Sequence, residues 1–87
     1  MHELSLLKDI FSKIELISKE NSDAPIRKAT IRLGALSHIS AEHFREHFFV
    51  AAKGTKAEHA SLEVIESDDT NDPQAQNIIL VSVDIQE

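Results

Sequence analysis

The chain has 87 residues, 41% of them hydrophobic, and a formal net charge of −6, which suits one small domain and leaves no room for two cores. This acidic balance argues against nucleic acid as a partner, because phosphate binding needs a basic face. The absence of cysteine excludes disulfides and thiolate chemistry and is compatible with a cytoplasmic location. We expect neither a targeting segment nor a membrane span, since no apolar run approaches roughly 20 residues.

Two amphipathic helices are expected. Residues 3 to about 20 form the first, because apolar residues recur there at spacings of three and four, at Leu4, Leu7, Ile10 or Phe11, Ile14 and Ile17. Residues 41 to about 53 form the second, with Ser40 as its N-cap and Gly54 as its C-cap. In this helix Phe44, Phe48 and Ala51 are predicted to face the core.

Three strands are expected around these helices. Residues 26–35 alternate between apolar and polar side chains, and residues 61–66 do so with Leu62 and Val64 inward. The closing strand covers residues 78–86, where Ile79, Val81, Val83 and Ile85 alternate with Leu80, Ser82, Asp84 and Gln86. The prediction is an α+β fold, in the order α-β-α-β-β, with a small three-stranded mixed sheet and two helices packed on one face.

Residues 67–77 are rich in Asp, Asn, Ser and Pro and are read as an exposed loop without a core of its own. Calcium binding by its three Asp residues is disfavoured, because the Gly and terminal Glu of an EF-hand loop are missing. The chain also lacks a Cys nucleophile, a GxSxG elbow and a phosphate-binding glycine loop. We therefore predict that it is not an enzyme.

The five histidines are candidate metal ligands. His43 and His47 stand four apart on the second expected helix, so they share one face, and His38 precedes that helix closely enough to suggest a three-histidine cluster. The segment is not an HExxH motif, because Phe follows His43. The pattern favours exposed helix residues over ligands, and His59 is assigned no role.

A chelating motif occupies the start of the chain, where Met1 is followed by His2 and Glu3. A terminal amine, a deprotonated backbone amide and an imidazole can close small chelate rings, and an all-nitrogen square plane suits Ni(II) or Cu(II). By spacing alone the tripeptide is a weak signal.

Three blocks around this motif are similar to the HypA/HybF family of hydrogenase nickel-incorporation proteins. They are MHELSL at residues 1–6, IRLGALS at residues 31–37, and AKGT at residues 52–55 followed by Ala57 and Glu58. The resemblance extends from residue 1 to about residue 66, and residues 83–87 are similar to the family's closing strand. Family members usually carry a zinc domain with two CxxC motifs between the second and closing strands. Here residues 67–77 stand in its place, and no zinc is expected.

The resemblance implies a single nickel-binding-type domain over residues 1–87 that carries Ni(II) as transient cargo, with metal ligands His2 and Glu3. His2 would supply its imidazole and backbone amide, and Glu3 its backbone amide. The implied partners are a maturation GTPase of the HypB type and a hydrogenase or urease precursor, and the first helix would contribute to docking. Two alternatives stay open: a metal-free module that binds family partners, and a copper or zinc buffer built on His38, His43 and His47. The oligomeric state is also open.

Overall fold

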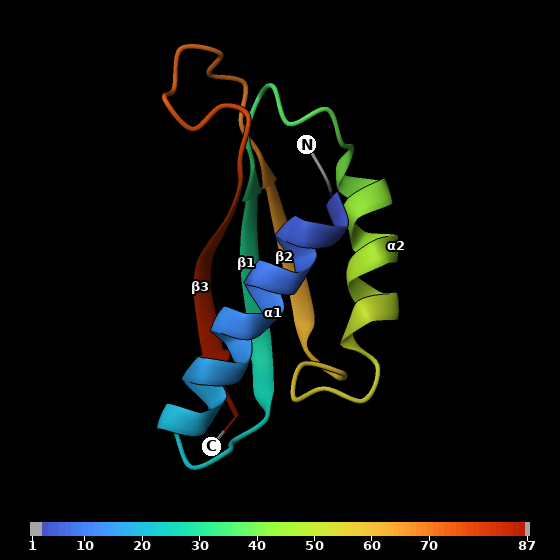
Figure 1. Ribbon diagram of the computed structural model, residues 1–87, viewed down its shortest axis with the longest axis vertical. Coiled ribbons are helices and arrows are strands. Elements are labelled where there is room, and N and C mark those ends of the chain that lie inside the picture. Colours follow the sequence, from blue (N-terminus) through green and yellow to red (C-terminus); the bar gives the residue numbers. More distant parts are fainter. Residues whose placement is uncertain (1–2, 87) are drawn as a thin grey trace.

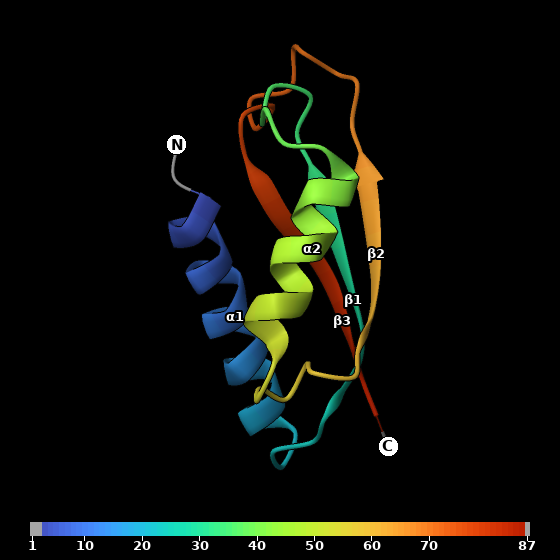
Figure 2. The same cartoon turned by 90° about the vertical axis from the view of Figure 1, so that its right-hand side faces the viewer.

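The computed structural model describes residues 3–86, and side chains from residue 5 onward. Its elements are α1 (Glu3–Glu20), β1 (Ile26–Leu33), α2 (Ala41–Ala52), β2 (Ser61–Glu66) and β3 (Ile78–Ile85). β1 is the middle strand, parallel to β2 and antiparallel to β3. Both helices cover the same face of the sheet (Figures 1 and 2). The predicted α+β fold is confirmed, and each element lies within two residues of its expected bounds.

α1 packs an apolar stripe against the sheet. Leu7, Ile10 and Ile14 are at most 3% exposed, as their spacing predicts. The stripe ends in a polar residue that the apolar pattern did not predict, because Ser18 is 1% exposed. Its hydroxyl donates a hydrogen bond of 2.7 Å to the carbonyl of Ala24, in the turn that leads to β1. Buried polar groups need hydrogen-bond partners, and this bond gives the Ser18 hydroxyl and the Ala24 carbonyl one each.

β1 separates an apolar layer from a charged one. Ala29, Ile31 and Leu33 are buried under the helices. Lys28 and Arg32 are only half-buried, as expected for side chains on the opposite, uncovered face. Lys28 pairs with Glu63 of β2 at 2.8 Å, so this face is a solvated surface crossed by ion pairs.

β3 differs from its predicted alternation. Thr30 pairs with Ser82, whereas the next residue, Ile31, pairs with Leu80, so Val81 is an extra residue in the ladder. Such a bulge shifts the alternation by one position. Leu80 consequently packs against the core, and Val81 is 52% exposed. The set of Ile79, Val81, Val83 and Ile85 was therefore wrong as a single face, because the strand changes phase at Val81.

α2 begins as predicted with Ser40 as its N-cap, but its C-cap is Lys53 rather than the predicted Gly54. The Ser40 hydroxyl accepts from the His43 amide at 3.1 Å, and Gly54 follows the helix with a φ of 80°, which glycine adopts without strain. Phe44 and Phe48 are fully buried. The third core residue is Ala52, four positions beyond Phe48, and the predicted Ala51 is exposed. Neither α1 nor α2 is long and apolar enough to cross a membrane.

The connection formed by residues 67–77 is fastened to the loop between β1 and α2. The Ala75 carbonyl accepts from the Leu36 amide at 2.7 Å, and the Asn77 carbonyl accepts from the Gly34 amide at 2.9 Å. Ala75 itself is 4% exposed, although most of the connection is exposed. A side chain at Gly34 would overlap the Ala75 carbonyl, so the two loops approach closely because position 34 is glycine.

Candidate metal site

The predicted ligands lie at the start of α1. Glu3 is the first residue of α1, while the Glu3 side chain and the whole of His2 lie outside the described part of the chain. The first four amides of a helix have no carbonyl partner within it, so binding a metal at the Glu3 amide nitrogen breaks no intrahelical hydrogen bond. A deprotonated amide is also anionic, and the helix macrodipole stabilises negative charge at this end. The start of a helix therefore suits coordination by backbone amides.

Both helices begin at the same end of the molecule and run in the same direction (Figures 1 and 2). They meet at Phe11 and Phe48, whose ring centroids are 4.9 Å apart. Glu3 precedes Phe11 by eight residues, and Ser40 precedes Phe48 by the same number, about 12 Å of helix in each case. The start of α1 is therefore roughly level with the N-cap of α2. The loop of residues 34–40 and the connection 67–77 lie at this same end (Figure 1).

His43 and His47 lie together near this end, on the first turns of α2. Their ring centroids are 4.4 Å apart, with the ring planes tilted by 32°. His43 is exposed and His47 is half-buried. The predicted placement of the two rings on one helix face is therefore correct.

His38 is exposed and stands before α2, with a positive φ of 62°. Among the side chains of residues 5–86, no three His, Cys, Asp or Glu residues gather closely enough to hold a metal ion. The suggested cluster of His38, His43 and His47 is therefore not formed. In the described part of the chain, His43 and His47 therefore form a pair without His38.

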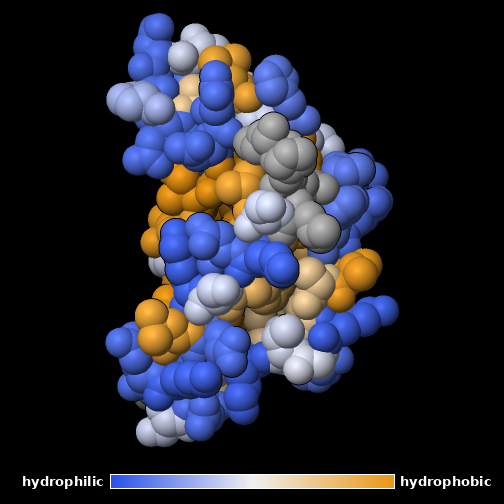
Figure 3. Space-filling model, viewed as in Figure 1, coloured by the Kyte–Doolittle hydropathy of each residue, from blue (hydrophilic) through white to orange (hydrophobic). Residues whose placement is uncertain are grey.

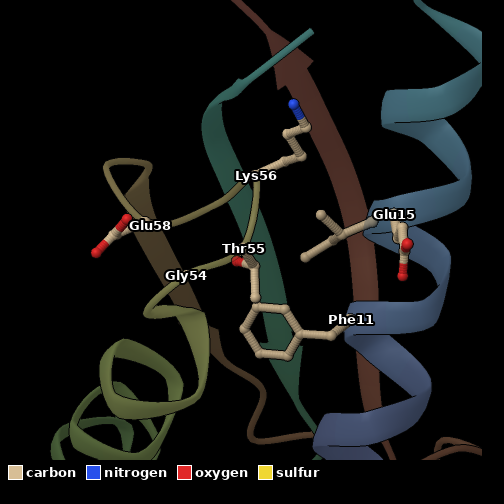
Figure 4. Close-up of a pocket in the computed structure, with 7 residues that line it drawn as sticks. Phe11, Glu15, Gly54, Thr55, Lys56 and Glu58 are labelled. Carbon is tan, nitrogen blue, oxygen red and sulfur yellow. The ribbon is translucent and has the colours of Figure 1, made fainter. Parts of the chain in front are cut away.

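A groove, called here the interhelical groove, runs along α1 and is bounded on its other side by the last turn of α2 and the loop of residues 54–58. Its larger part, with a volume of about 470 Å³, is lined by Phe11, Ile14, Glu15, Gly54, Thr55, Lys56 and Glu58. Figure 4 shows the Phe11 ring reaching from α1 toward Thr55 across this space. A smaller apolar part of about 190 Å³ shares Phe11 and Thr55 and adds Leu7, Lys8 and Ala51.

The interhelical groove was not predicted from the sequence. The residue that could have indicated it is Phe11, which the apolar spacing offers as an alternative to Ile10 for one core-facing position of the first helix. Ile10 is buried, whereas Phe11 is half-buried and packs against Phe48. A large aromatic beside the core stripe can mark the contact between two helices.

Comparison with known proteins identifies the relatives of this chain. Residues 1–71 match the family described as "Hydrogenase/urease nickel incorporation, metallochaperone, hypA". The chain belongs to the HypA family. Hydrogenase maturation factor HypA 1 of Bradyrhizobium diazoefficiens is 38% identical over 66 residues, which cover 76% of this chain and 58% of the relative. Hydrogenase maturation factor HypA of Acidithiobacillus ferrooxidans is 35% identical over 65 residues, with 75% and 58% covered.

A solved structure of a HypA protein shares the fold of this chain. The solution structure of the Ni metallochaperone HypA from Helicobacter pylori superposes with a TM-score of 0.77 at 17% identity, covering 98% of this chain and 97% of that chain. At this identity the match shows a shared fold. By sequence, the chain spans about 58% of the length of the curated relatives it matches.

Family membership confirms the resemblance seen in the three sequence blocks, and the family is one of maturation factors rather than enzymes. The family match ends at residue 71, inside the connection 67–77. The chain contains no cysteine, so a cysteine-held zinc site has no ligands in it. Whether residues 67–77 replace the family's zinc domain stays a prediction, as does the ligand set of His2 and Glu3.

Proposed function

We propose that this chain is a nickel-binding accessory protein that captures Ni(II) through its N-terminal Met-His-Glu motif and delivers it to a nickel enzyme during maturation. One observation carries the proposal: the match to a nickel-incorporation family begins at residue 1 and so includes the motif. The whole of residues 1–87 would act as one nickel-binding domain in the cytoplasm, with the connection 67–77 in place of a zinc domain.

The chemistry of the proposed site follows from its donors. The His2 imidazole and the amides of His2 and Glu3 would provide nitrogen ligands, with the Met1 amine as an available fourth donor. The Glu3 carboxylate would orient the site or contact a partner. Because imidazole and amide must both lose protons to bind, nickel affinity would fall as the pH drops through the range where imidazole is protonated. A carrier must release its ion as well as capture it, so weak binding at this motif would suit the proposed role.

The proposed partners are a maturation GTPase of the HypB type and a hydrogenase or urease precursor. The helix-bearing face would receive the GTPase, because apolar surface is exposed on it between polar regions (Figure 3). Leu16 of α1 and Val50 of α2 are both more than half exposed, and Phe11 of α1 and Ala51 of α2 line the smaller part of the interhelical groove. Contiguous exposed apolar surface is typical of protein contact sites. Nucleic acid and membrane are not proposed as partners.

A calorimetric Ni(II) titration tests the carrier proposal. The protein needs its native, untagged N-terminus and is compared with His2→Ala and with a form extended before Met1. We expect saturable binding by the wild type, loss of its tightest binding event in His2→Ala, and weaker binding by the extended form. His59→Ala is the matched control, since His59 is an exposed histidine outside the motif. Equal binding by all four proteins, or none by the wild type, would refute the proposal.

The second candidate is a metal-free interaction module that binds family partners without carrying nickel. The absence of cysteine favours it, because a cysteine-held zinc site has no ligands in this chain. A binding assay with a HypB-type GTPase separates the two functions. The module predicts that His2→Ala binds the GTPase as the wild type does while neither protein binds Ni(II) in the titration.

A further inference from the structure

The two flanks of α2 face different neighbours. Arg45 leaves the helix beside β2, where its guanidinium donates to the Leu62 carbonyl at 2.8 Å. Phe44 points into the core, and His43 is rotated from it by about 100° in the direction opposite to Arg45. His47 lies one turn further along the flank of His43, away from β2.

The flank of His43 and His47 faces α1. Ala51 continues it by another turn and lines the smaller part of the interhelical groove together with Leu7 and Lys8 of α1. Because α1 and α2 run in the same direction, the histidines lie closer than Ala51 to the end where α1 begins (Figures 1 and 2). The pair therefore occupies the upper part of this flank, at the end of the molecule that carries the N-terminal motif.

The spacing of the two rings matches the requirement for chelation. A metal–nitrogen bond of about 2.0–2.1 Å places each imidazole centre roughly 3.2 Å from the ion, so two imidazoles lie roughly 4.5 Å apart around a square-planar ion and roughly 5.2 Å apart around tetrahedral Zn(II). The observed separation of the ring centroids is 4.4 Å, close to the first value. Both rings are also attached to one helix, so the two ligands are already neighbours before an ion binds.

We propose that His43 and His47 form a second metal-binding site, a pair of imidazole ligands for Ni(II), Cu(II) or Zn(II). Imidazole is a preferred ligand of these borderline ions. Among the side chains of residues 5–86, no third His, Cys, Asp or Glu lies close enough to add a ligand to the pair. A site with two protein ligands exchanges its ion rapidly. It gives the helix-bearing face a metal-binding position that is independent of His2.

The test uses the protein in a His2→Ala background, without an affinity tag, so that the N-terminal motif is disabled. Zn(II), which is diamagnetic, is added while the histidine ring resonances are followed by NMR. We expect the signals of His43 and His47 to shift together and saturate with one equivalent. Adding His43→Ala or His47→Ala should weaken binding by at least about tenfold, the scale on which metal sites respond to altered ligation. Ni(II) titrations of the same proteins establish that nickel uses the pair.

Two further variants make the result specific. His59→Ala removes an exposed histidine elsewhere and should leave zinc affinity unchanged. The double variant His43→Ala with Ala51→His rebuilds an i, i+4 pair at positions 47 and 51, and should restore binding, because Ala51 is exposed on the same flank. Circular dichroism verifies folding, which is expected because alanine favours helix more than histidine does.

Three outcomes would refute the proposal of a second metal-binding site. They are an absence of saturable zinc binding in the His2→Ala protein, a response by only one of the two rings, and equal losses in His59→Ala and His47→Ala. Any of these leaves the nickel-carrier proposal intact, since that proposal rests on loss of binding when His2 is removed. Conversely, zinc binding by the histidine pair stands even if the N-terminal motif binds no nickel.

Discussion

The part of the chain that matches the HypA family and the part that follows it contribute differently to one structure. Residues 1–71 contain both helices, β1 and β2, whereas β3 lies beyond the match. Yet β3 pairs with β1 from Ile26 to Leu33 and completes the sheet. A strand needs backbone pairing and apolar side chains on one face, which many sequences supply. The chelation proposed for the N-terminus would need particular residues, so the two parts should tolerate sequence change to different degrees.

The largest expected effect is the loss of β3. A chain that ends at residue 71 should not fold, because β1 would become an edge strand and its core residues Ala29 and Ile31, now fully buried, would lose their cover on one side. A domain of this size has little stability in reserve. We expect no cooperative thermal unfolding and poor dispersion of amide NMR signals. A well-dispersed spectrum would show that the family-matched part is an independent domain.

Next in size is the removal of the aromatic contact between the helices. Phe48 is fully buried and packs against Phe11 and Phe44, so Phe48→Ala should lower the free energy of unfolding by about 3–5 kcal/mol. Val50, two positions further on, is 68% exposed, and Val50→Ala should cost less than about 1 kcal/mol. Urea denaturation of both variants measures the difference. Similar losses would mean that the α1–α2 contact is not the centre of the core.

Local patterns predicted most of this fold because each element obeys its own periodicity. The errors arose where tertiary context intervenes. Val81 became exposed because a bulge against Thr30 and Ile31 shifted the strand, and a bulge leaves no trace in an alternating apolar run. Ala51 was predicted to be buried where Ala52 is, because two neighbouring alanines cannot be distinguished by hydrophobicity. Ser18 is buried through one hydrogen bond to a residue of the following turn.

The candidate sites were predictable to a smaller extent. Helical spacing placed His43 and His47 on one face, and their ring contact agrees. The orientation of that face toward α1 depends on how α2 packs, which Arg45 and Ala51 reveal only in three dimensions. The role of His2 rested on family resemblance, because a tripeptide carries no periodic signal. The interhelical groove depends on how two helices pack, and its available trace in the sequence was the aromatic Phe11 beside the core stripe of α1.

A third, smaller effect tests the contact between the two parts of the chain. Gly34→Ala would place its Cβ onto the carbonyl of Ala75, so we expect a loss of about 1–3 kcal/mol, the usual cost of overpacking. Gly54→Ala is the matched control. No atom lies within 4 Å of its Cβ position, and its cost of about 1–2 kcal/mol would come from the positive φ alone. If the loops are packed as described, Gly34→Ala alone should accelerate hydrogen exchange at the Leu36 amide, which bonds the Ala75 carbonyl.

The smallest effect concerns Asp72, which contacts both parts of the chain. One carboxylate oxygen accepts from the Gln74 amide at 2.9 Å, and the other lies 3.7 Å from the Arg32 guanidinium. Asp72→Asn keeps an acceptor for the amide and removes the charge, so it should cost at most about 1 kcal/mol, as for partly exposed ion pairs. Asp72→Ala removes the hydrogen bond as well and should cost about 1 kcal/mol more.

Thermal unfolding at low and high salt separates the contribution of the charge from that of the hydrogen bond. The difference between wild type and Asp72→Asn should shrink in high salt, whereas the difference between Asp72→Asn and Asp72→Ala should persist. A salt-independent cost of Asp72→Asn would mean that Asp72 acts through its hydrogen bond within the connection rather than through the charge of Arg32.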